Sequence, residues 1–310
     1  MSFLGLDVGG SQCRFEWWPS GVLPGGDGTS VQPAVHGLEA TADGLARVLL
    51  RAAQQASPTA AVCAMAGVGD AATSSALVAA LRARGVTFPT AVVGDVLAAA
   101  AAGLATGPGV LLWAGTGSFA IARSTDGALH RTGGRGYLLG DQGSGYDLVR
   151  RAAAAVLLAV DELGPPTALT PALVAAFAAP APQRLGAVLQ RLSPGEVAAR
   201  LPVVLEVAAA GDPVANDVLA EGVDALTMLA TAAVRKAGLD WRGLPVAVGG
   251  GVCSGALGVV DLLRERLRAL GAEPPRAIAP RAAAHAAAWL AHGWHLRQEP
   301  QYAWVHRVAL

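Results

Sequence analysis

Short apolar runs alternate with amphipathic stretches along the first third of the chain. Residues 3–8 form an apolar run that ends in two glycines, and residues 14–18 continue the pattern after them, which predicts a β-hairpin with a glycine-rich turn. Residues 20–30 are rich in glycine and are expected to form a loop, whereas residues 38–55 place leucine and valine at helical spacing. Two further strands, each followed by a helix, are predicted at residues 60–66, 71–84, 90–93 and 95–105. Strands that alternate with helices after an opening hairpin predict an α/β layer.

The same architecture begins again in the second half of the chain. An apolar strand, a glycine turn, a return strand and a third strand are predicted at residues 109–114, 115–118, 119–123 and 128–132. Helices then dominate, at residues 143–160, 170–179, 183–191, 201–210 and 213–238, before a strand at 245–248, a helix up to about 268 and a last helix at 281–291. We therefore predict an α/β protein of two domains, residues 1–106 and 107–310. The second domain is helix-rich, and the last helix is able to pack back on the first domain.

Composition narrows the class of protein. The length of 310 residues suits two domains, and 53% hydrophobic against 15% charged residues excludes disorder as the main state. The 23 basic and 23 acidic residues balance, so we expect no nucleic-acid partner and no binding to an anionic membrane. Cys13, Cys63 and Cys253 form no closely spaced pair, which favours a reducing, cytoplasmic location. The uncharged stretch 96–122 could span a bilayer, but glycine and proline at 107–109 predict two short elements instead.

The first candidate site follows the first apolar run, where Asp7 and Val8 precede Gly9, Gly10 and Ser11. Glycines let backbone N–H groups approach a phosphate closely, and a serine adds a hydroxyl donor. A carboxylate repels phosphate unless a cation lies between them, so Asp7 is predicted to hold Mg²⁺ through water. The same residues also fit a plain hairpin turn that Asp7 only stabilises.

Two later glycine segments have related properties. Residues 115–118 combine two glycines with two hydroxyl side chains after an apolar strand, which predicts a second phosphate-binding turn. Residues 249–251 are three glycines after a strand, where a flat adenine or ribose could lie against the backbone. Neither segment matches the P-loop or the dinucleotide-binding pattern, and each alone also fits an ordinary turn. The glycine turns at 9–11 and 115–118 occupy matching positions of the two halves, which favours ligand binding by both.

Two carboxylates stand beside glycines at predicted strand and helix ends. Asp95 follows Gly94 at the start of a helix, where an Asp commonly caps helix N–H groups. The helix dipole keeps the same carboxylate ionised, so it can also accept a hydroxyl proton in phosphoryl transfer. Residues 133–136 and 140–145 are unusually rich in glycine, which suits a backbone that wraps a ligand, with Asp141 accepting bonds from sugar hydroxyls. A flexible surface loop is the alternative.

Taken in order, the segments GLDVGGS at 5–11, GD at 94–95, AGTGS at 114–118 and GDQGSGY at 140–146 resemble the sugar-kinase, Hsp70 and actin ATPase superfamily. The chain is most similar to the family that joins N-acetylglucosamine kinase, bacterial glucosamine kinase and the BadF/BadG/BcrA/BcrD ATPases. The resemblance implies two ribonuclease-H-like domains with a cleft between them, and a homodimer. It also implies ATP and Mg²⁺ as cofactors and phosphate transfer to the 6-hydroxyl of a sugar.

The resemblance further implies roles for individual residues. Asp95 matches the catalytic base. Phosphate and adenosine binding is implied for Gly9, Gly10, Ser11, Gly115, Thr116, Gly117, Ser118, Gly249, Gly250 and Gly251. Sugar binding is implied for Asp95, Asp141, Gly134, Gln32 and Thr116. Relatives usually place an Asn before the first long helix, where this chain has Ser30 and Gln32, and this departure leaves the identity of the sugar open.

Three functions remain open at this point. A kinase for glucosamine or N-acetylglucosamine is favoured, and a kinase for an anhydro- or muramic-type sugar is the second possibility. A nucleotide-dependent regulator without turnover is the third, but Asp7, Asp95 and Asp141 argue against it, because a nucleotide binder needs no base. The activator branch of the family holds an iron–sulfur cluster with paired cysteines, which this chain lacks.

Overall fold

The structure is a computed structural model that describes residues 1–9, 12–104, 107–255, 257–279, 281–297 and 308–309. The chain divides into two compact units. Unit 1 comprises Met1–Gly107, Thr125–Leu129 and Ala279–Leu310, and unit 2 comprises Pro108–Ser124 and His130–Ile278. The residues from Ala279 onward, including the last long helix, therefore group with the N-terminal part of the chain.

The sheet of unit 1 has the strand order β3–β2–β1–β4–β5. Strand β1 (Phe3–Val8) pairs antiparallel with β2 (Cys13–Trp18) and parallel with β4 (Ala60–Met65), which pairs parallel with β5 (Thr90–Gly94). The predicted hairpin and both later strands are thus confirmed. The loop predicted at 20–30 contains a short edge strand, β3 (Gly26–Gly28), because its backbone pairs with β2 although its glycines carry no strand signal.

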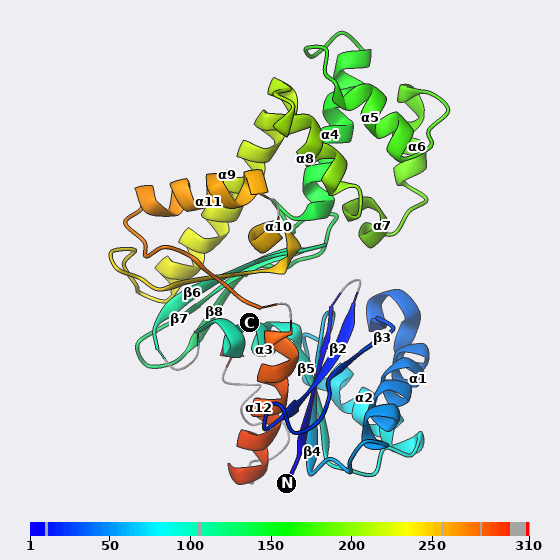
Figure 1. Ribbon diagram of the computed structural model, residues 1–310, viewed down its shortest axis with the longest axis vertical. Helices are drawn as coiled ribbons and strands as arrows, with labels where there is room; N and C mark the ends of the chain where they lie inside the picture. Colours follow the sequence, from blue (N-terminus) through cyan, green and yellow to red (C-terminus); the bar gives the residue numbers. More distant parts are fainter. Residues whose placement is uncertain (10–11, 105–106, 256, 280, 298–307, 310) are drawn as a thin grey trace. The chain divides into compact units, whose positions relative to one another are not determined.

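Helices cover both faces of this sheet (Figure 1). Helices α1 (Pro33–Ala53) and α2 (Ala71–Ala83) share one hydrophobic core with Leu4 and Leu6 of β1. Helices α3 (Asp95–Leu104) and α12 (Ala282–Arg297) share another core with Phe3 on the opposite face. Because side chains alternate along a strand, Asp7 points to the same face as Phe3 and lies on the α3 side.

Two helices of unit 1 show how glycine and proline set local geometry. Helix α1 begins at Pro33, five residues before the predicted start at 38, because proline is tolerated in the first turn. Gly37, with φ of 76°, interrupts the helix just before its regular part. Helix α12 packs directly on β1: a Cβ atom at Gly5 would lie 2.1 Å from the backbone nitrogen of Ala288. The absence of a side chain at Gly5 and the many alanines of α12 permit this close approach.

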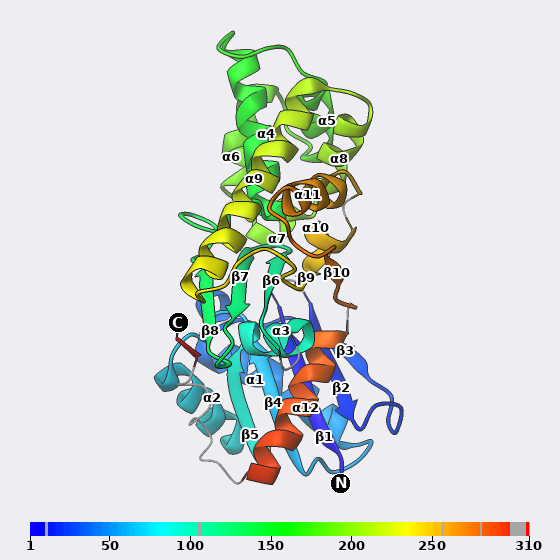
Figure 2. The same cartoon turned by 90° about the vertical axis from the view of Figure 1, so that its left-hand side faces the viewer.

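The sheet of unit 2 runs in the order β10–β9–β6–β7–β8 (Figure 2). Its strands are β6 (Gly109–Ala114), β7 (Ser118–Arg123), β8 (Leu129–Gly133), β9 (Val246–Gly249) and β10 (Arg276–Ala277). Strands β6 and β7 are antiparallel, whereas β9 pairs parallel with β6 and β10 pairs parallel with β9. The predicted strand, glycine turn and return strand of the second half are therefore confirmed, and β10 is an element that the sequence pattern did not predict.

Helices of unit 2 enclose its own hydrophobic core. They are α4 (Gly145–Val160), α5 (Leu169–Ala176), a 3₁₀ turn at Pro182–Arg184, α6 (Leu185–Leu189), α7 (Pro194–Ala198), α8 (Leu201–Ala209), α9 (Pro213–Lys236), α10 (Gly250–Gly255) and α11 (Leu257–Ala269). The short α7 was not predicted, although Ser193 and Glu196 form a capping box at its start. The helix predicted from the triple glycine up to about 268 is divided into α10 and α11. Strand β11 (Val308–Ala309) lies beyond the last predicted helix.

The uncharged stretch at 96–122 raised the possibility of a helix that spans a membrane. In the described part of the chain, no helix is both long enough and apolar enough to cross a bilayer.

Candidate active site

Two carboxylates lie together in unit 1. Asp7 is near the end of β1, and Asp95 begins α3 directly after β5. Strands β1, β4 and β5 are parallel, so their carboxyl ends meet at one edge of the sheet. The pKa of Asp7 is raised to about 7, chiefly by burial and then by the charge of Asp95, while the guanidinium group of Arg14 acts in the opposite direction. Asp7 and Asp95 are thus close enough to repel one another.

Asp95 is anchored where its helix begins. Its Oδ1 accepts a hydrogen bond from the backbone N–H of Val96 at 2.9 Å, and the side chain is half-buried. The neighbouring Gly94 is required for packing, because a Cβ atom there would lie 2.9 Å from the carbonyl oxygen of Val68. A negatively charged side chain at a helix N-terminus interacts favourably with the helix dipole. The helix-start and general-base interpretations are therefore compatible, and the catalytic role stays a prediction.

Hydrogen bonds connect Gly9 of the first predicted phosphate loop to Gln12 and to two residues just before α1. The N–H of Gly9 donates to the carbonyl of Gln12 at 2.9 Å. The carbonyl of Gly9 accepts bonds from Ser30 Oγ at 2.6 Å and from Gln32 Nε2 at 3.1 Å. Gly10 and Ser11 lie outside the described residues. Gln32 therefore uses its amide N–H to hold this loop, and its predicted contact with sugar stays a prediction.

Arg14 is the residue of this region that the sequence did not single out as a site residue. It stands opposite Asp7 in the β1–β2 register, and its Nη2 donates to Oε1 of Gln12 at the end of the loop. A cation beside two carboxylates and a phosphate-type loop reduces the electrostatic cost of bringing those groups together. The hairpin predicted from the sequence contained the signal, because its register places these two residues side by side.

In unit 2, the turn at residues 115–118 is attached to the glycine-rich segment at 140–145. The N–H of Gly115 donates to the carbonyl of Gly117 at 2.9 Å across the turn, which includes the half-buried Thr116. Ser118 Oγ donates to the carbonyl of Gln142 at 2.7 Å, and the N–H of Gly145 donates to the carbonyl of Gly115 at 2.8 Å. The two segments therefore form one hydrogen-bonded piece.

Asp141 lies at the centre of this piece. It adopts a positive φ of 56° and is only 9% exposed. Burial raises the pKa of its carboxyl group, and hydrogen bonds from the backbone N–H groups of Ser118 and Gly136 act in the opposite direction. A Cβ atom at Gly117 would lie 2.7 Å from Oδ2 of Asp141, so a larger residue in the turn would displace this carboxylate. Its predicted bond to sugar would add to these backbone bonds and stays a prediction.

Gly134 lies on the other side of the same turn. Its N–H donates to the carbonyl of Ser118 at 2.8 Å, and its own carbonyl accepts a bond from Arg131 Nη2 at 2.7 Å. Gly134 has a φ of 65°, a conformation that favours glycine. The predicted sugar-side residues Asp141, Gly134 and Thr116 are thus neighbours in unit 2.

The triple glycine after β9 meets the end of β6. A Cβ atom at Gly249 would lie 2.3 Å from the ring of Trp113, and one at Gly250, which has a φ of 80°, would lie 2.3 Å from the carbonyl oxygen of Ala114. Gly251 has no such neighbour within 4 Å. The first two glycines are therefore required by packing, and the third leaves room for a ligand.

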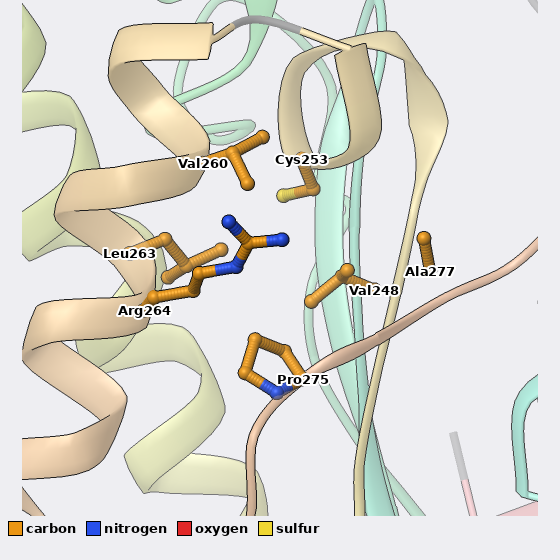
Figure 3. A pocket seen from close by; sticks show the side chains of 7 residues that line it. All are labelled: Val248, Cys253, Val260, Leu263, Arg264, Pro275 and Ala277. Carbon is orange, nitrogen blue, oxygen red and sulfur yellow. The ribbon is translucent and has the colours of Figure 1, made fainter.

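A small cavity borders this segment (Figure 3). It has a volume of about 80 Å³ and is lined by Val248, Cys253, Val260, Leu263, Arg264, Pro275 and Ala277. The guanidinium group of Arg264 points into it from α11, towards Cys253 of α10. Burial raises the pKa of the Cys253 thiol to about 12, so this cysteine stays protonated and serves as an apolar wall. The lining is otherwise apolar.

The predicted site residues thus form two groups. Asp7, Gly9, Gln32 and Asp95 belong to unit 1, and the glycine segments of residues 115–118, 133–145 and 249–251 belong to unit 2. The predicted meeting of Asp7, Asp95 and Asp141 at one cleft stays a prediction. Among the described residues, no three His, Cys, Asp or Glu side chains form a metal cluster. Two mutually repelling carboxylates nevertheless suit Mg²⁺, which keeps several waters and needs few protein ligands.

Comparison with known proteins shows the family to which the chain belongs. The family model described as "BadF/BadG/BcrA/BcrD ATPase family" matches residues 4–287. An N-acetyl-D-glucosamine kinase of Dictyostelium discoideum is 34% identical over 135 residues, which cover 43% of this chain and 42% of that protein. An N-acetylmuramic acid/N-acetylglucosamine kinase of Clostridium acetobutylicum is 29% identical over 178 residues, which cover 57% of this chain and 58% of that protein. The chain spans about half the length of the curated relatives it matches.

Solved structures share the fold over nearly the whole chain. A candidate N-acetylglucosamine kinase from Chromobacterium violaceum has a TM-score of 0.75 and 25% identity, covering 93% of this chain and 98% of that one. A ROK family glucokinase from Streptomyces griseus, in complex with glucose and AMPPNP, has a TM-score of 0.63 and 19% identity, covering 94% and 100%. The predicted α/β fold of the actin-like sugar kinases, with a helix-rich second part, is thereby confirmed.

Proposed function

Because the chain belongs to the BadF/BadG/BcrA/BcrD ATPase family, we propose that it is an ATP-dependent amino-sugar kinase. It would transfer the γ-phosphate of ATP to the 6-hydroxyl of glucosamine or N-acetylglucosamine. The observation that supports this most strongly is the pairing of Asp7 and Asp95 at the carboxyl edge of parallel strands. Two close carboxylates in this position suit a divalent cation and a general base, both of which phosphoryl transfer requires.

In this proposal, unit 1 supplies the base. Asp95 would accept the proton of the sugar hydroxyl as the hydroxyl oxygen forms its bond to the γ-phosphorus. The bond between that phosphorus and the β,γ-bridging oxygen breaks, and ADP leaves. Asp7 would hold Mg²⁺ through water, and that ion would neutralise phosphate charge. The repulsion between Asp7 and Asp95 supports such an arrangement, because a cation between them would relieve it.

Unit 2 would bind the nucleotide and orient the sugar. The turn at 115–118 offers backbone N–H groups and the Thr116 hydroxyl for phosphate, and Gly251 is open for the adenosine side. Asp141 would accept a bond from a sugar hydroxyl. Magnesium, a homodimeric assembly and a cytoplasmic location are the finer parts of the same proposal.

A muramic-type sugar is a second candidate substrate. The relative from Clostridium acetobutylicum is named for both N-acetylmuramic acid and N-acetylglucosamine. In this chain Gln32, whose amide N–H is bonded to Gly9, occupies the region where an Asn was expected. A side chain engaged with the loop leaves sugar selectivity to other groups, so a bulkier sugar stays compatible with the site.

A sugar panel tests the proposal. ADP release is measured with ATP and Mg²⁺ and each of glucosamine, N-acetylglucosamine, N-acetylmuramic acid and glucose, and the product is identified by ³¹P NMR. Sugar-dependent turnover with one amino sugar at its 6-hydroxyl is the expected result. ATP binding without turnover on any sugar would favour a regulator and overturn the proposal.

The Asp95→Ala variant tests the base. We expect turnover to fall by about a hundredfold or more, the range for loss of a general base, while ATP affinity stays nearly unchanged. Asp70→Ala is the matched control, because Asp70 also caps a helix of unit 1, at the start of α2, with an exposed side chain. Near-normal turnover in Asp95→Ala would remove Asp95 from the mechanism.

A further inference from the structure

Asp147, which the proposed reaction does not use, is a buried carboxylate with three charged or polar partners. Only 6% of its side chain is exposed. Its Oδ2 accepts the N–H of Gly143 at 2.9 Å and Nε of Arg151 at 2.8 Å, and its Oδ1 accepts Nη2 of Arg150 at 2.7 Å. Burial acts to raise the pKa of Asp147, but these partners outweigh it and hold the pKa below its ordinary value. The Asp147 carboxylate is therefore buried in its ionised form, with all three of these bonds stabilising its charge.

Its backbone partner occupies a constrained position. Gly143 has a φ of 73°, and a Cβ atom there would lie 2.4 Å from the carbonyl oxygen of Gly222 in α9. Gly143 is thus pressed against α9 in a conformation that few residues adopt. Arg151 extends the same connection, because its Nη1 donates to Glu221 of α9 at 2.9 Å. Asp147 consequently ties the 140–145 segment to α4 and α9 at one point.

The turn at 115–118 and the segment at 140–145 differ in how well other backbone hydrogen bonds support them. The turn at 115–118 is the loop of the β6–β7 hairpin, whose strands pair from Gly109 to Arg123 and would keep its shape. Asp141 has no such ladder, since it lies in an irregular segment with a positive φ. Its position depends on Gly143, two residues away, and on the bonds from Ser118 and Gly136.

We propose that Asp147 is the positioning residue that fixes the 140–145 segment, and with it Asp141, for sugar binding. This inference rests on the proposed sugar-kinase function. In this proposal Asp147 acts through the N–H of Gly143 and not through contact with a reactant. Loss of the Asp147 carboxylate should therefore loosen the 140–145 segment more than the turn at 115–118.

Two variants separate charge from shape. Asp147→Asn retains an oxygen for the N–H of Gly143 but loses both ion pairs, and Asp147→Ala loses all three bonds. We expect the KM for the sugar to rise about threefold in the first and about tenfold or more in the second, with the KM for ATP changing less than about threefold. Hydrogen exchange of the peptide that contains residues 140–146 should accelerate in the same order.

Asp212→Ala is the matched control. Asp212 caps α9 and also accepts three bonds, from Ala215 N at 2.9 Å, Ala168 N at 2.7 Å and Thr167 Oγ1 at 2.9 Å. Its removal costs unit 2 a comparable set of hydrogen bonds without touching the 140–145 segment. The control should lower the melting temperature and leave both the sugar KM and the exchange of the 140–146 peptide unchanged.

The outcomes are distinguishable. If Asp147→Ala matches Asp212→Ala in sugar KM and in exchange, Asp147 has only a general structural role and the inference is wrong. If Asp147→Ala does not fold, Asp147→Asn decides by the same two measurements. If the wild-type chain phosphorylates no sugar, the proposed function fails, and the exchange measurement then shows separately whether Asp147 holds the segment.

Discussion

At the residue scale, the carboxyl group of Asp7 links the charge of the candidate site to the stability of the chain. Its pKa is raised from an ordinary 3.8 to about 7, chiefly by burial and then by Asp95. Between those two pH values the folded chain binds more protons than the unfolded chain, so ionisation of Asp7 lowers the free energy of unfolding as pH rises. Below the ordinary pKa this cost disappears.

Asp7→Asn should therefore stabilise the metal-free chain in a pH-dependent manner. The gain in unfolding free energy should be near zero at pH 4 and reach about 2–4 kcal/mol at pH 8, because each pKa unit corresponds to 1.36 kcal/mol. Urea denaturation in EDTA at both pH values measures it. Adding Mg²⁺ at pH 8 should stabilise the wild-type chain more than the variant.

Asp217→Asn, at an exposed position in α9, is the control for the loss of one carboxylate. If Asp7→Asn raised the free energy of unfolding equally at pH 4 and pH 8, the ionisation of Asp7 would not be the cause. A change that does not depend on pH would point to packing instead.

Some of the site was predictable from residue types alone. Glycines next to an acidic residue at strand ends indicated Asp7 and Asp95, and in the structure the charge of Asp95 acts on Asp7, while their roles stay predictions. Asp147 was not predictable in this way, because its partners include Arg151, which in turn contacts Glu221, 70 residues further along the chain. An isolated Asp in the first turn of a helix has the same local pattern as an ordinary capping residue.

At the element scale, apolar strands of about six residues were predicted well and the shortest strands were not. The runs at 109–114 and 60–66 are apolar and short, and such a length between turn residues is typical of buried strands. The short strands β3 and β10, with three and two residues, depend on pairing with a neighbour, so their own side chains carry little signal. Where an element owes its existence to tertiary contacts, periodicity cannot reveal it.

The contact between β1 and α12 gives a prediction at this scale. Gly5→Ala would place a methyl group 2.1 Å from the backbone of α12, so the helix must shift away from the sheet. We expect a loss of about 3 kcal/mol in unfolding free energy, at the upper end for overpacking. Denaturation by urea measures the loss. Gly69→Ala is the control, because nothing lies within 4 Å of a Cβ atom there, and equal stability of the two variants would contradict the packing argument.

At the scale of the whole molecule, each unit has a hydrophobic core of its own. One core lies among β6, β7, β9 and the helices of unit 2, and two others lie on the two faces of the unit 1 sheet. Separate cores allow separate unfolding steps, because two-state behaviour is characteristic of single domains. The glycine segments proposed to bind the nucleotide, at 115–118 and 249–251, belong to unit 2 alone.

Adenosine, which has no phosphates, should therefore stabilise one unfolding step only. At a concentration 100-fold above its dissociation constant, it should add about 2.7 kcal/mol to the unfolding of unit 2 and nothing to that of unit 1. Hydrogen exchange during urea unfolding assigns each step through peptides of β6 and of β4. Gly251→Val should abolish this gain without changing the ligand-free steps, since no atom within 4 Å opposes a side chain there. Equal protection of both units by adenosine would instead mean that the adenosine side of the nucleotide is not bound by unit 2 alone.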